Sequence, residues 1–282
     1  MKFVSFRFLE RSYSGVLEGN RVLPLLDRES GKPVSLQGAI ERGLCAATVG
    51  DFLDGLRSVA LDEIEVLPPI VHPGKIFCVG TNYENHRVET AREKATKPPL
   101  FLRTAETLVA DGAPLLSPPE SAMLDFEGEI AIIMGRPARR VPKEAALECV
   151  FGYSCFNDAS VRDWQRHTHQ WTPGKNFDAT GGFGPFLVTK DEVGAPEDLH
   201  LTTTLNGRVV QDAYGHQMIF SIAEIIEYIT TFTTLRAGDV IATGTPGGVG
   251  AFRDPPLFMK AGDRVEVEIS RVGLLSNPII AG

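Results

Sequence analysis

Two glutamates separated by a single residue lie in the segment LDFEGEI at residues 124–130, and this pattern restricts the fold strongly. Side chains alternate faces along a strand, so Glu127 and Glu129 are expected on one face while apolar neighbours cover the other. Adjacent carboxylates repel unless a cation lies between them, and hard divalent cations prefer oxygen ligands. Asp158, after a second apolar run, would complete an acidic cup. The pattern predicts a strand carrying a metal site; the alternative is a solvent-facing strand with an ordinary acidic edge.

The composition is that of a globular protein and gives no sign of nucleic-acid or membrane binding. Of the 282 residues, 43% are hydrophobic and 23% are charged, and the net charge is −8. There is no basic excess for a nucleic-acid surface, and no apolar run approaches the ~18–20 residues that span a bilayer. The N-terminal MKFVSFR predicts a strand and not a signal peptide, and the four cysteines lack ligand spacing. We expect reduced thiols in a cytoplasmic protein.

Strands and turns dominate the expected secondary structure. We expect strands at residues 1–7, 75–79, 129–134, 150–155, 186–189, 201–205 and 240–243, and hairpin turns at 17–20 and 206–207. We expect helices at 48–59 and from Ser221, and a helix or lid-like segment at 84–94. Because strands and helices do not alternate regularly, the sequence favours an α+β fold over a doubly wound sheet.

The segment at residues 67–74 contains three prolines and can continue neither a helix nor a central strand. We therefore place a boundary there, between a small N-terminal α+β domain at 1–66 and a larger domain at 67–282.

His86 and Glu89 are three residues apart in an expected helix and would share one face. A carboxylate beside an imidazole orients the ring and gives a base able to deprotonate water near neutral pH. The alternative is a surface ion pair, which is the commoner role of such a spacing. The position just after a strand favours a site, because loops at strand ends often carry function.

Other side chains could contribute to the same cup. Lys175 lies between a glycine turn and an apolar residue, where it could stabilise a developing enolate, although a solvated lysine is the default. Arg162 and Gln165 follow Asp158 closely and could reach it. The glycine-rich loop at 243–250 lacks the ending of a phosphate-binding loop, so it is better suited to offer N–H groups and the Thr245 hydroxyl to a substrate carboxylate.

Taken in order, several short motifs resemble the fumarylacetoacetate hydrolase family, in its acylpyruvase-like or hydroxyhepta-diene-dioate isomerase-like branch. The motifs are NYxxHxxE at 82–89, FLR at 101–103, FEGE at 126–129, NDxxxRD at 157–163, GKNFD at 174–178, MIFS at 218–221 and GDVIxTGTPxGVG at 238–250. Each motif is weak alone, and the ordered set is specific. It covers about residues 70–282, whereas residues 1–66 resemble only the variable N-terminal segment of the family.

The resemblance implies a catalytic domain of mixed β-roll or β-sandwich type, usually dimeric, that takes small dicarbonyl acids as substrates. It implies Mg²⁺ or Mn²⁺ held by Glu127, Glu129 and Asp158. It also matches His86 and Glu89 to a catalytic dyad, Lys175 to an active-site lysine and Thr245 to a substrate-carboxylate contact. Further positions that could line the substrate site are Tyr83, Arg162, Gln165 and Gln211.

One position departs from the family pattern. Many members have lysine where this chain has Arg103. Arginine offers a planar fork of donors suited to a carboxylate, so Arg103 either favours a substrate with a second carboxylate or is a tolerated variant.

The leading hypothesis is a metal-dependent hydrolase that cleaves a carbon–carbon bond of a 2,4-dioxo acid, of the acylpyruvate or fumarylpyruvate type, as in aromatic catabolism. His86 would activate water, and the metal and Lys175 would stabilise the enolate that leaves. The alternative is oxaloacetate decarboxylation, or isomerisation or tautomerisation of a hydroxydiene dioate, through the same metal enolate. A binding protein that kept the fold and lost the chemistry is a third possibility.

Overall fold

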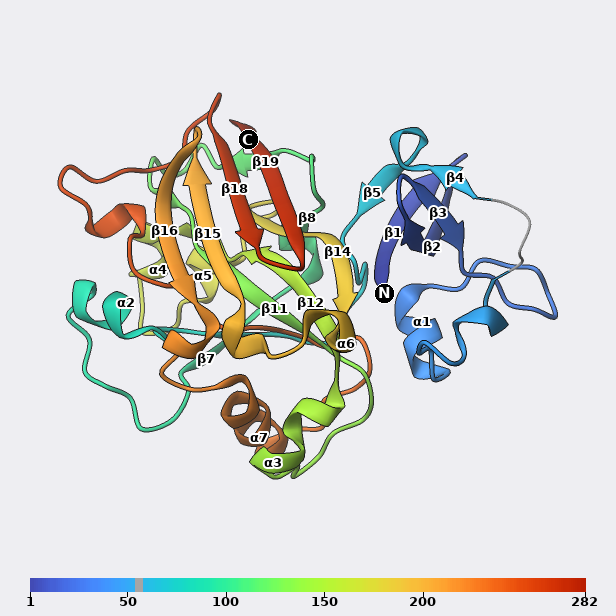
Figure 1. The fold of residues 1–282 in the computed structure, drawn as a ribbon. Helices are drawn as coiled ribbons and strands as arrows, with labels where there is room; N and C mark the ends of the chain where they lie inside the picture. Colours follow the sequence, from blue (N-terminus) through green and yellow to red (C-terminus); the bar gives the residue numbers. More distant parts are fainter. Residues whose placement is uncertain (54–57) are drawn as a thin grey trace.

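The computed structural model describes residues 1–53 and 58–282, and strands dominate this part of the chain (Figure 1). The strands are β1 (Lys2–Phe8), β2 (Arg11–Glu18), β3 (Arg21–Pro24), β4 (Val59–Ala60), β5 (Glu65–Leu67), β6 (Ile76–Val79), β7 (Leu100–Arg103), β8 (Leu108–Val109), β9 (Leu115–Ser117), β10 (Leu124–Asp125), β11 (Gly128–Met134), β12 (Val150–Asn157), β13 (Ser160–Val161), β14 (Gly181–Thr189), β15 (His200–Leu205), β16 (Arg208–Tyr214), β17 (Val240–Ala242), β18 (Arg264–Ile269) and β19 (Gly273–Ala281).

The helices are fewer and shorter. They are α1 (Leu36–Glu41), α2 (Glu84–Glu89), α3 (Lys143–Ala146), α4 (Arg162–Gln165), α5 (Thr172–Lys175), α6 (Lys190–Val193) and α7 (Ile222–Phe232). Short 3₁₀ turns occupy Val49–Asp51, Leu61–Glu63, Ala105–Thr107, Leu147–Cys149, Pro196–Asp198, Gly215–Gln217 and Gly250–Phe252. None of the helices in the described residues is long and apolar enough to cross a membrane.

A large mixed sheet forms the centre of the molecule. Its strands follow the order β4-β3-β2-β1-β14-β12-β11-β17-β6-β7, with β5 paired to β1 and β8 paired to β14. A second sheet has the order β16-β15-β18-β19-β9, and Figure 1 shows it in front of β11 and β12. Strands β10 and β13 form a small separate pair. The α+β class and the mixed β-sandwich architecture expected from the sequence are confirmed.

The central strand β11 is buried on both faces and separates two apolar cores. Ile130 and Ile132 pack in a core with α7 and the second sheet, whereas Ala131 and Ile133 face a core that reaches α1. Helix α7 begins where the sequence predicted: the Ser221 hydroxyl accepts from the Glu224 backbone N–H, and the Glu224 carboxylate accepts from the Ser221 N–H at 2.8 Å. This reciprocal cap and the apolar stripe explain why the helix forms.

Strand pairing brings distant parts of the chain to one end of the large sheet. Strand β11 runs antiparallel to β12 with Gly128 opposite Asn157, so the glutamates at the start of β11 lie beside the residue that follows β12. Strand β17 is antiparallel to β11, and β6 is parallel to β17. The loop after β17 and the helix α2 after β6 therefore come to the same end. The strand register therefore brings the three carboxylates, the glycine-rich loop and helix α2 to one end of the sheet.

Two helix predictions need correction. The helix predicted at 48–59 is wrong in the described residues: a single 3₁₀ turn, Val49–Asp51, and a strand beginning at Val59 occupy its ends, and residues 54–57 lie outside the described residues. The helix predicted at 84–94 ends at Glu89, because Ala91 adopts a left-handed conformation (φ 52°) that a helix cannot continue.

The N-terminal segment joins the central sheet. Strand β1 pairs with β14 and with β5, so the residues before the proline-dense segment extend the same sheet that carries the candidate site. Figure 1 shows β2, β3 and α1 to one side of the second sheet. The division at residue 66 stays a prediction.

Candidate metal centre and active site

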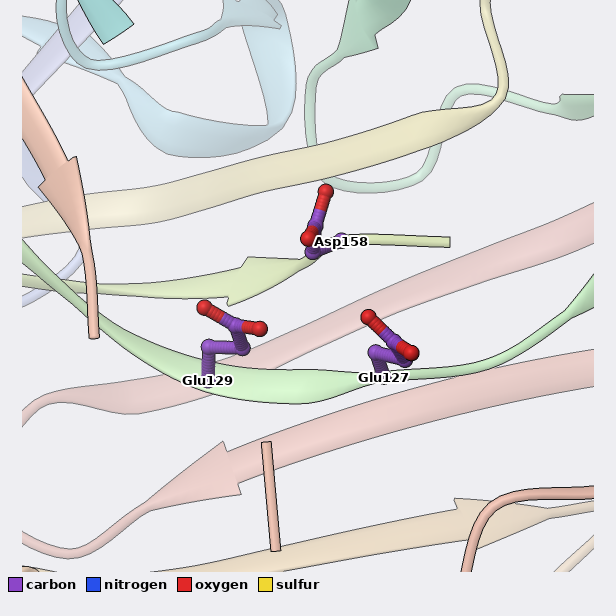
Figure 2. A group of neighbouring side chains, drawn as sticks. All are labelled: Glu127, Glu129 and Asp158. Atoms are coloured by element: carbon purple, nitrogen blue, oxygen red, sulfur yellow. The ribbon is translucent and has the colours of Figure 1, made fainter. Parts of the chain in front are cut away.

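Three carboxylates form a compact, buried group at the end of the large sheet. Oxygens of Glu127, Glu129 and Asp158 all lie within 4.8 Å of one another, and no more than 5% of any of these residues is exposed. Figure 2 shows Glu127 and Glu129 projecting from one side of the same chain segment, with Asp158 near them, just past the end of the neighbouring strand. The burial excludes the alternative of a solvent-facing acidic edge. The group could hold a divalent cation.

Lys175 lies against two of these carboxylates. Its Nζ donates to Glu127 Oε2 at 2.5 Å, to Asp158 Oδ2 at 2.6 Å and to the Asp158 carbonyl at 3.0 Å, so all three ammonium hydrogens are engaged. Although burial alone would lower it, the charges of Asp158 and Glu127 raise the pKa of Lys175. Lys175 therefore stays protonated inside the protein and carries a fixed positive charge beside the carboxylates.

Two buried arginines complete the charge balance. Arg103 donates from Nη1 to Asp158 Oδ1 at 2.7 Å and also binds the Ala159 carbonyl and two threonine hydroxyls. Arg162 pairs through Nη1 with Glu127 Oε1 at 2.7 Å and through Nε with Asp125 Oδ2 at 2.8 Å. Burial alone would raise the pKa of Glu127, but Lys175 and Arg162 lower it to about 2. Glu127 is thus ionised at any physiological pH.

Glu129 is the exception in this network. Within the described residues it forms no ion pair, and its Oε2 accepts a 2.8 Å hydrogen bond from the Gly244 N–H. Burial and the charges of Asp158 and Glu127 raise its pKa well above the usual value. A hard cation among the three carboxylates would remove this repulsion and keep Glu129 ionised. The donor set therefore fits a divalent metal.

The predicted dyad lies next to this group. His86 Nδ1 and Glu89 Oε1 are 2.7 Å apart, and the other Glu89 oxygen accepts from the Gly248 N–H at 2.9 Å. Because Nδ1 is occupied by Glu89, Nε2 is the ring nitrogen left for a proton transfer. The same glycine-rich loop binds Glu129 through Gly244, so one loop fixes both the dyad and a metal-ligand candidate.

A cavity of about 400 Å³ opens above the carboxylates. Eight residues named from the sequence line it: His86, Glu127, Glu129, Asp158, Arg162, Gln165, Lys175 and Thr245. Four others lie outside the lining. Glu89 acts on His86, Arg103 binds Asp158, and Gln211 donates to the Thr245 hydroxyl at 2.7 Å. Tyr83 is 1% exposed, and its hydroxyl has no hydrogen-bond partner among the described residues.

The Thr245 hydroxyl is held by the protein itself. It donates to the Gly128 carbonyl at 3.0 Å while accepting from Gln211. Its proton is therefore directed at the start of β11 and away from a substrate. A substrate-carboxylate contact by Thr245 stays a prediction, and it would require the hydroxyl to turn.

The sequence reasoning missed several residues of the site. Asp125 is fully buried and accepts from the N–H groups of Gly250 and Ala251 as well as from Arg162, so it ties the glycine-rich loop to the cavity wall. Its signal was present as an acid between two apolar residues, Leu124 and Phe126, next to the two glutamates. Arg92, Arg166, Trp171 and Phe252 also line the cavity, and no motif indicated them.

Comparison with known proteins gives a consistent answer. A profile described as fumarylacetoacetate (FAA) hydrolase C-terminal matches residues 75–280. Oxaloacetate tautomerase YisK from Bacillus subtilis (strain 168) is 40% identical over 301 residues, covering 99% of this chain and 100% of the relative. The human protein named oxaloacetate tautomerase FAHD2A, mitochondrial, is 39% identical over 288 residues, covering 99% of this chain and 92% of the relative.

Solved structures agree with the fold. Fumarylacetoacetate hydrolase (EaFAH) from psychrophilic Exiguobacterium antarcticum superposes with a TM-score of 0.87 at 34% identity, covering both chains completely. The 2-hydroxyhepta-2,4-diene-1,7-dioate isomerase from Mycobacterium marinum gives a TM-score of 0.80 at 30% identity, covering 100% of this chain and 98% of the other. Both hydrolases and isomerases therefore share this architecture, so the fold alone does not fix the reaction.

Proposed function

Because the chain belongs to the fumarylacetoacetate hydrolase family of enzymes, we propose that it is a divalent-metal-dependent oxaloacetate tautomerase, with Mg²⁺ or Mn²⁺ as its cation. The proposal replaces carbon–carbon hydrolysis as the leading function. Its support is that relatives named oxaloacetate tautomerase align over 99% of this chain at 39–40% identity. Among the proteins compared above, hydrolysis is supported by one structure named a hydrolase, at the lower identity of 34%.

The observation that carries the proposal is the buried carboxylate group beneath the cavity, with a histidine–glutamate dyad beside it. Glu127, Glu129 and Asp158 would hold the cation. When bound, the cation would polarise the 2-oxo group of the substrate and so favour loss of a proton from the adjacent carbon. Enol and keto forms of oxaloacetate differ only in whether one proton lies on the C2 oxygen or on C3, so the reaction needs a base and a charged oxygen site.

This chain supplies both. His86, held at Nδ1 by Glu89, leaves Nε2 to take the proton from C3 and to return it in the reverse direction. Lys175 acts through its charge, because its three hydrogens are engaged by Glu127 and Asp158. That charge favours the build-up of negative charge on the C2 oxygen. The buried position of both groups keeps water away from the transferred proton.

Hydrolysis of an acylpyruvate is the second candidate, and the dyad is the observation that favours it. A histidine oriented by a carboxylate can also activate water for attack on a carbonyl. The two reactions would use the same carboxylates and the same Lys175. They differ in whether the dyad takes its proton from C3 or from water.

The test is a panel assay on the full-length protein with Mg²⁺ or Mn²⁺ and with an EDTA control. Oxaloacetate, acylpyruvates and fumarylpyruvate are the substrates. We expect metal-dependent interconversion of enol and keto oxaloacetate, followed by ultraviolet absorbance, with no loss of mass. Release of pyruvate and a carboxylic acid from an acylpyruvate would support hydrolysis instead. Release of CO₂ from oxaloacetate would support decarboxylation. Activity unaffected by EDTA would contradict the metal.

The homodimer is proposed from the resemblance alone, and the cytoplasmic location from the cysteine usage and the N-terminal sequence. Size-exclusion chromatography with light scattering tests the first. Fractionation of the source cells tests the second.

A further inference from the structure

The outer end of the cavity is lined by two arginines that each lie over an aromatic ring. The Arg92 guanidinium lies 4.6 Å from the centroid of the Trp171 ring, and that of Arg166 lies 5.7 Å from the centroid of Phe252. All four residues line the cavity, and we call them the mouth. They come from separate parts of the chain: the turn after α2, the end of α4, the loop before α5 and the 3₁₀ turn after β17.

The mouth carries positive charge that the protein leaves without a partner. Within the described residues, neither Arg92 nor Arg166 forms an ion pair or a side-chain hydrogen bond. Arg92, Arg162 and Arg166 all line the same cavity, and partial burial together with the charges of Arg162 and Arg166 lowers the pKa of Arg92. Cations gathered in this way repel unless an anion joins them.

Arg162 connects the mouth to the carboxylates below. Its Nε and Nη1 are engaged by Asp125 and Glu127, whereas its buried Nη2 has no hydrogen-bond partner among the described residues. A buried guanidinium nitrogen without an acceptor is costly to the protein. Arg92 and Arg166, which line the same cavity as Arg162 and have no carboxylate of their own among the described residues, are therefore available to bind one carboxylate of a ligand.

We propose that Arg92 and Arg166 bind the second carboxylate of the substrate and so select 2-oxo dicarboxylates over 2-oxo monocarboxylates. This rests on the proposed function, in which the first carboxylate and the 2-oxo group face Glu127, Glu129 and Asp158. The aromatic rings hold the two guanidinium planes in place, so that less side-chain freedom is lost when the anion binds. Arg92 and Arg166 are specificity-determining residues and take no part in proton transfer.

Binding measurements test this independently of catalysis. Isothermal titration calorimetry on the full-length protein with Mg²⁺ uses malate (both enantiomers), lactate and oxalate. Malate and lactate offer the same carboxylate and 2-hydroxyl group and differ in the distal carboxylate. Oxalate occupies only the metal end. We expect the wild-type protein to bind malate about tenfold or more tightly than lactate, as charge-assisted hydrogen bonds predict.

The variants Arg92→Gln and Arg166→Gln should each lower this malate preference about five- to tenfold, and the double variant should nearly abolish it. Oxalate affinity should stay within about twofold, because oxalate does not reach the mouth. Arg92→Lys should retain part of the preference, since it keeps the charge without the fork. The control is Arg208→Gln, an exposed arginine of β16 outside the cavity lining.

Two results would overturn the inference. One is an unchanged preference for malate in both glutamine variants. The other is an equal loss of malate, lactate and oxalate affinity, which would indicate general damage to the cavity. Failure of the proposed function looks different: a wild-type protein that does not tautomerise oxaloacetate but whose malate preference depends on Arg92 and Arg166 would leave the inference standing.

Discussion

The two ends of the cavity differ in burial and in how their charged side chains are paired. At the floor, formed by Glu127, Glu129, Asp158 and Lys175, the side chains are buried at the end of the large sheet, and Lys175 binds Glu127 and Asp158 directly. At the mouth, Arg92 and Arg166 project from short turns, reach solvent and lie against aromatic rings without ion pairs of their own in the described residues. The floor thus has an excess of carboxylates that a cation would satisfy, whereas the mouth has an excess of cations that an anion would satisfy.

This contrast indicates how chemistry and selectivity are divided in the molecule. Groups that must keep their charge and position during proton transfer gain from a rigid, low-dielectric setting. Groups that only recognise one end of a ligand can lie on turns, where substitutions cost little stability. A change at the floor should therefore affect metal binding and rate. A change at the mouth should affect substrate affinity.

Glu129→Gln should have the largest effect, because Glu129 is the floor carboxylate without a cation of its own. We expect tautomerase activity to fall to background with a large loss of Mn²⁺ affinity, measured by calorimetry. The metal-free protein should be as stable as wild type or more so, since a neutral amide removes the repulsion from Asp158 and Glu127. Glu268→Gln, at an exposed position of β18, is the control. Normal metal affinity in Glu129→Gln would contradict the assignment of metal binding to the floor.

His86→Ala should have the next largest effect and should separate the dyad from the metal. We expect a rate loss of about 10²–10⁴-fold with Mn²⁺ affinity unchanged, because a general base contributes to the rate without holding the cation. The matched control is His200→Ala, since His200 makes the same kind of contact with Asp212, at 2.9 Å, on a distant strand. An active His86→Ala variant would move the proton transfer to another residue.

Much of the fold and the floor could be predicted from the sequence, because local patterns determine them. The alternation around Glu127 and Glu129 gave the strand and the shared face, and the capping box gave the start of α7. The glycine and asparagine of the turn at 206–207 gave the hairpin between β15 and β16, where both residues have positive φ. These features depend on neighbours in the chain, which a single sequence contains.

The rest depended on tertiary contacts that no local pattern carries. Arg103 was expected at the substrate, yet its donors are directed at Asp158 and nearby oxygens outside the cavity lining. The sequence identified the position of Arg103 but not the direction of its side chain. Arg92 and Arg166 had no periodic or spacing signal, because the segments that carry them line one cavity only in the folded chain.

Gly80→Ala tests the mouth without changing any charge. A Cβ at Gly80 would overlap the Trp171 ring, which supports Arg92. We expect the KM for oxaloacetate to rise about three- to tenfold while kcat stays within about twofold, because the ring would move and the arginine with it. Gly50→Ala is the control, since an added Cβ there meets nothing within 4 Å. A fall in kcat at unchanged KM would indicate that Trp171 affects the reaction step, and would contradict the view that the mouth affects only substrate affinity.

Glu224→Gln should have the smallest effect. It tests whether a carboxylate with its own cation, but without burial, contributes to metal binding as the floor carboxylates do. The Lys143 ammonium, at 2.8 Å, and the Ser221 backbone and hydroxyl donors lower the pKa of Glu224 from 4.5 to about 2. Its contribution to stability is therefore present above about pH 4.5 and is lost as the pH falls toward 2. Because the pair is largely exposed, Glu224→Gln should cost only about 0.5–1 kcal/mol near neutral pH, and the difference in Tm from wild type should shrink on acidification. The variant should leave metal affinity unchanged. At this helix cap Glu224 is already paired with Lys143, whereas the floor has more carboxylates than cations and could bind a metal ion.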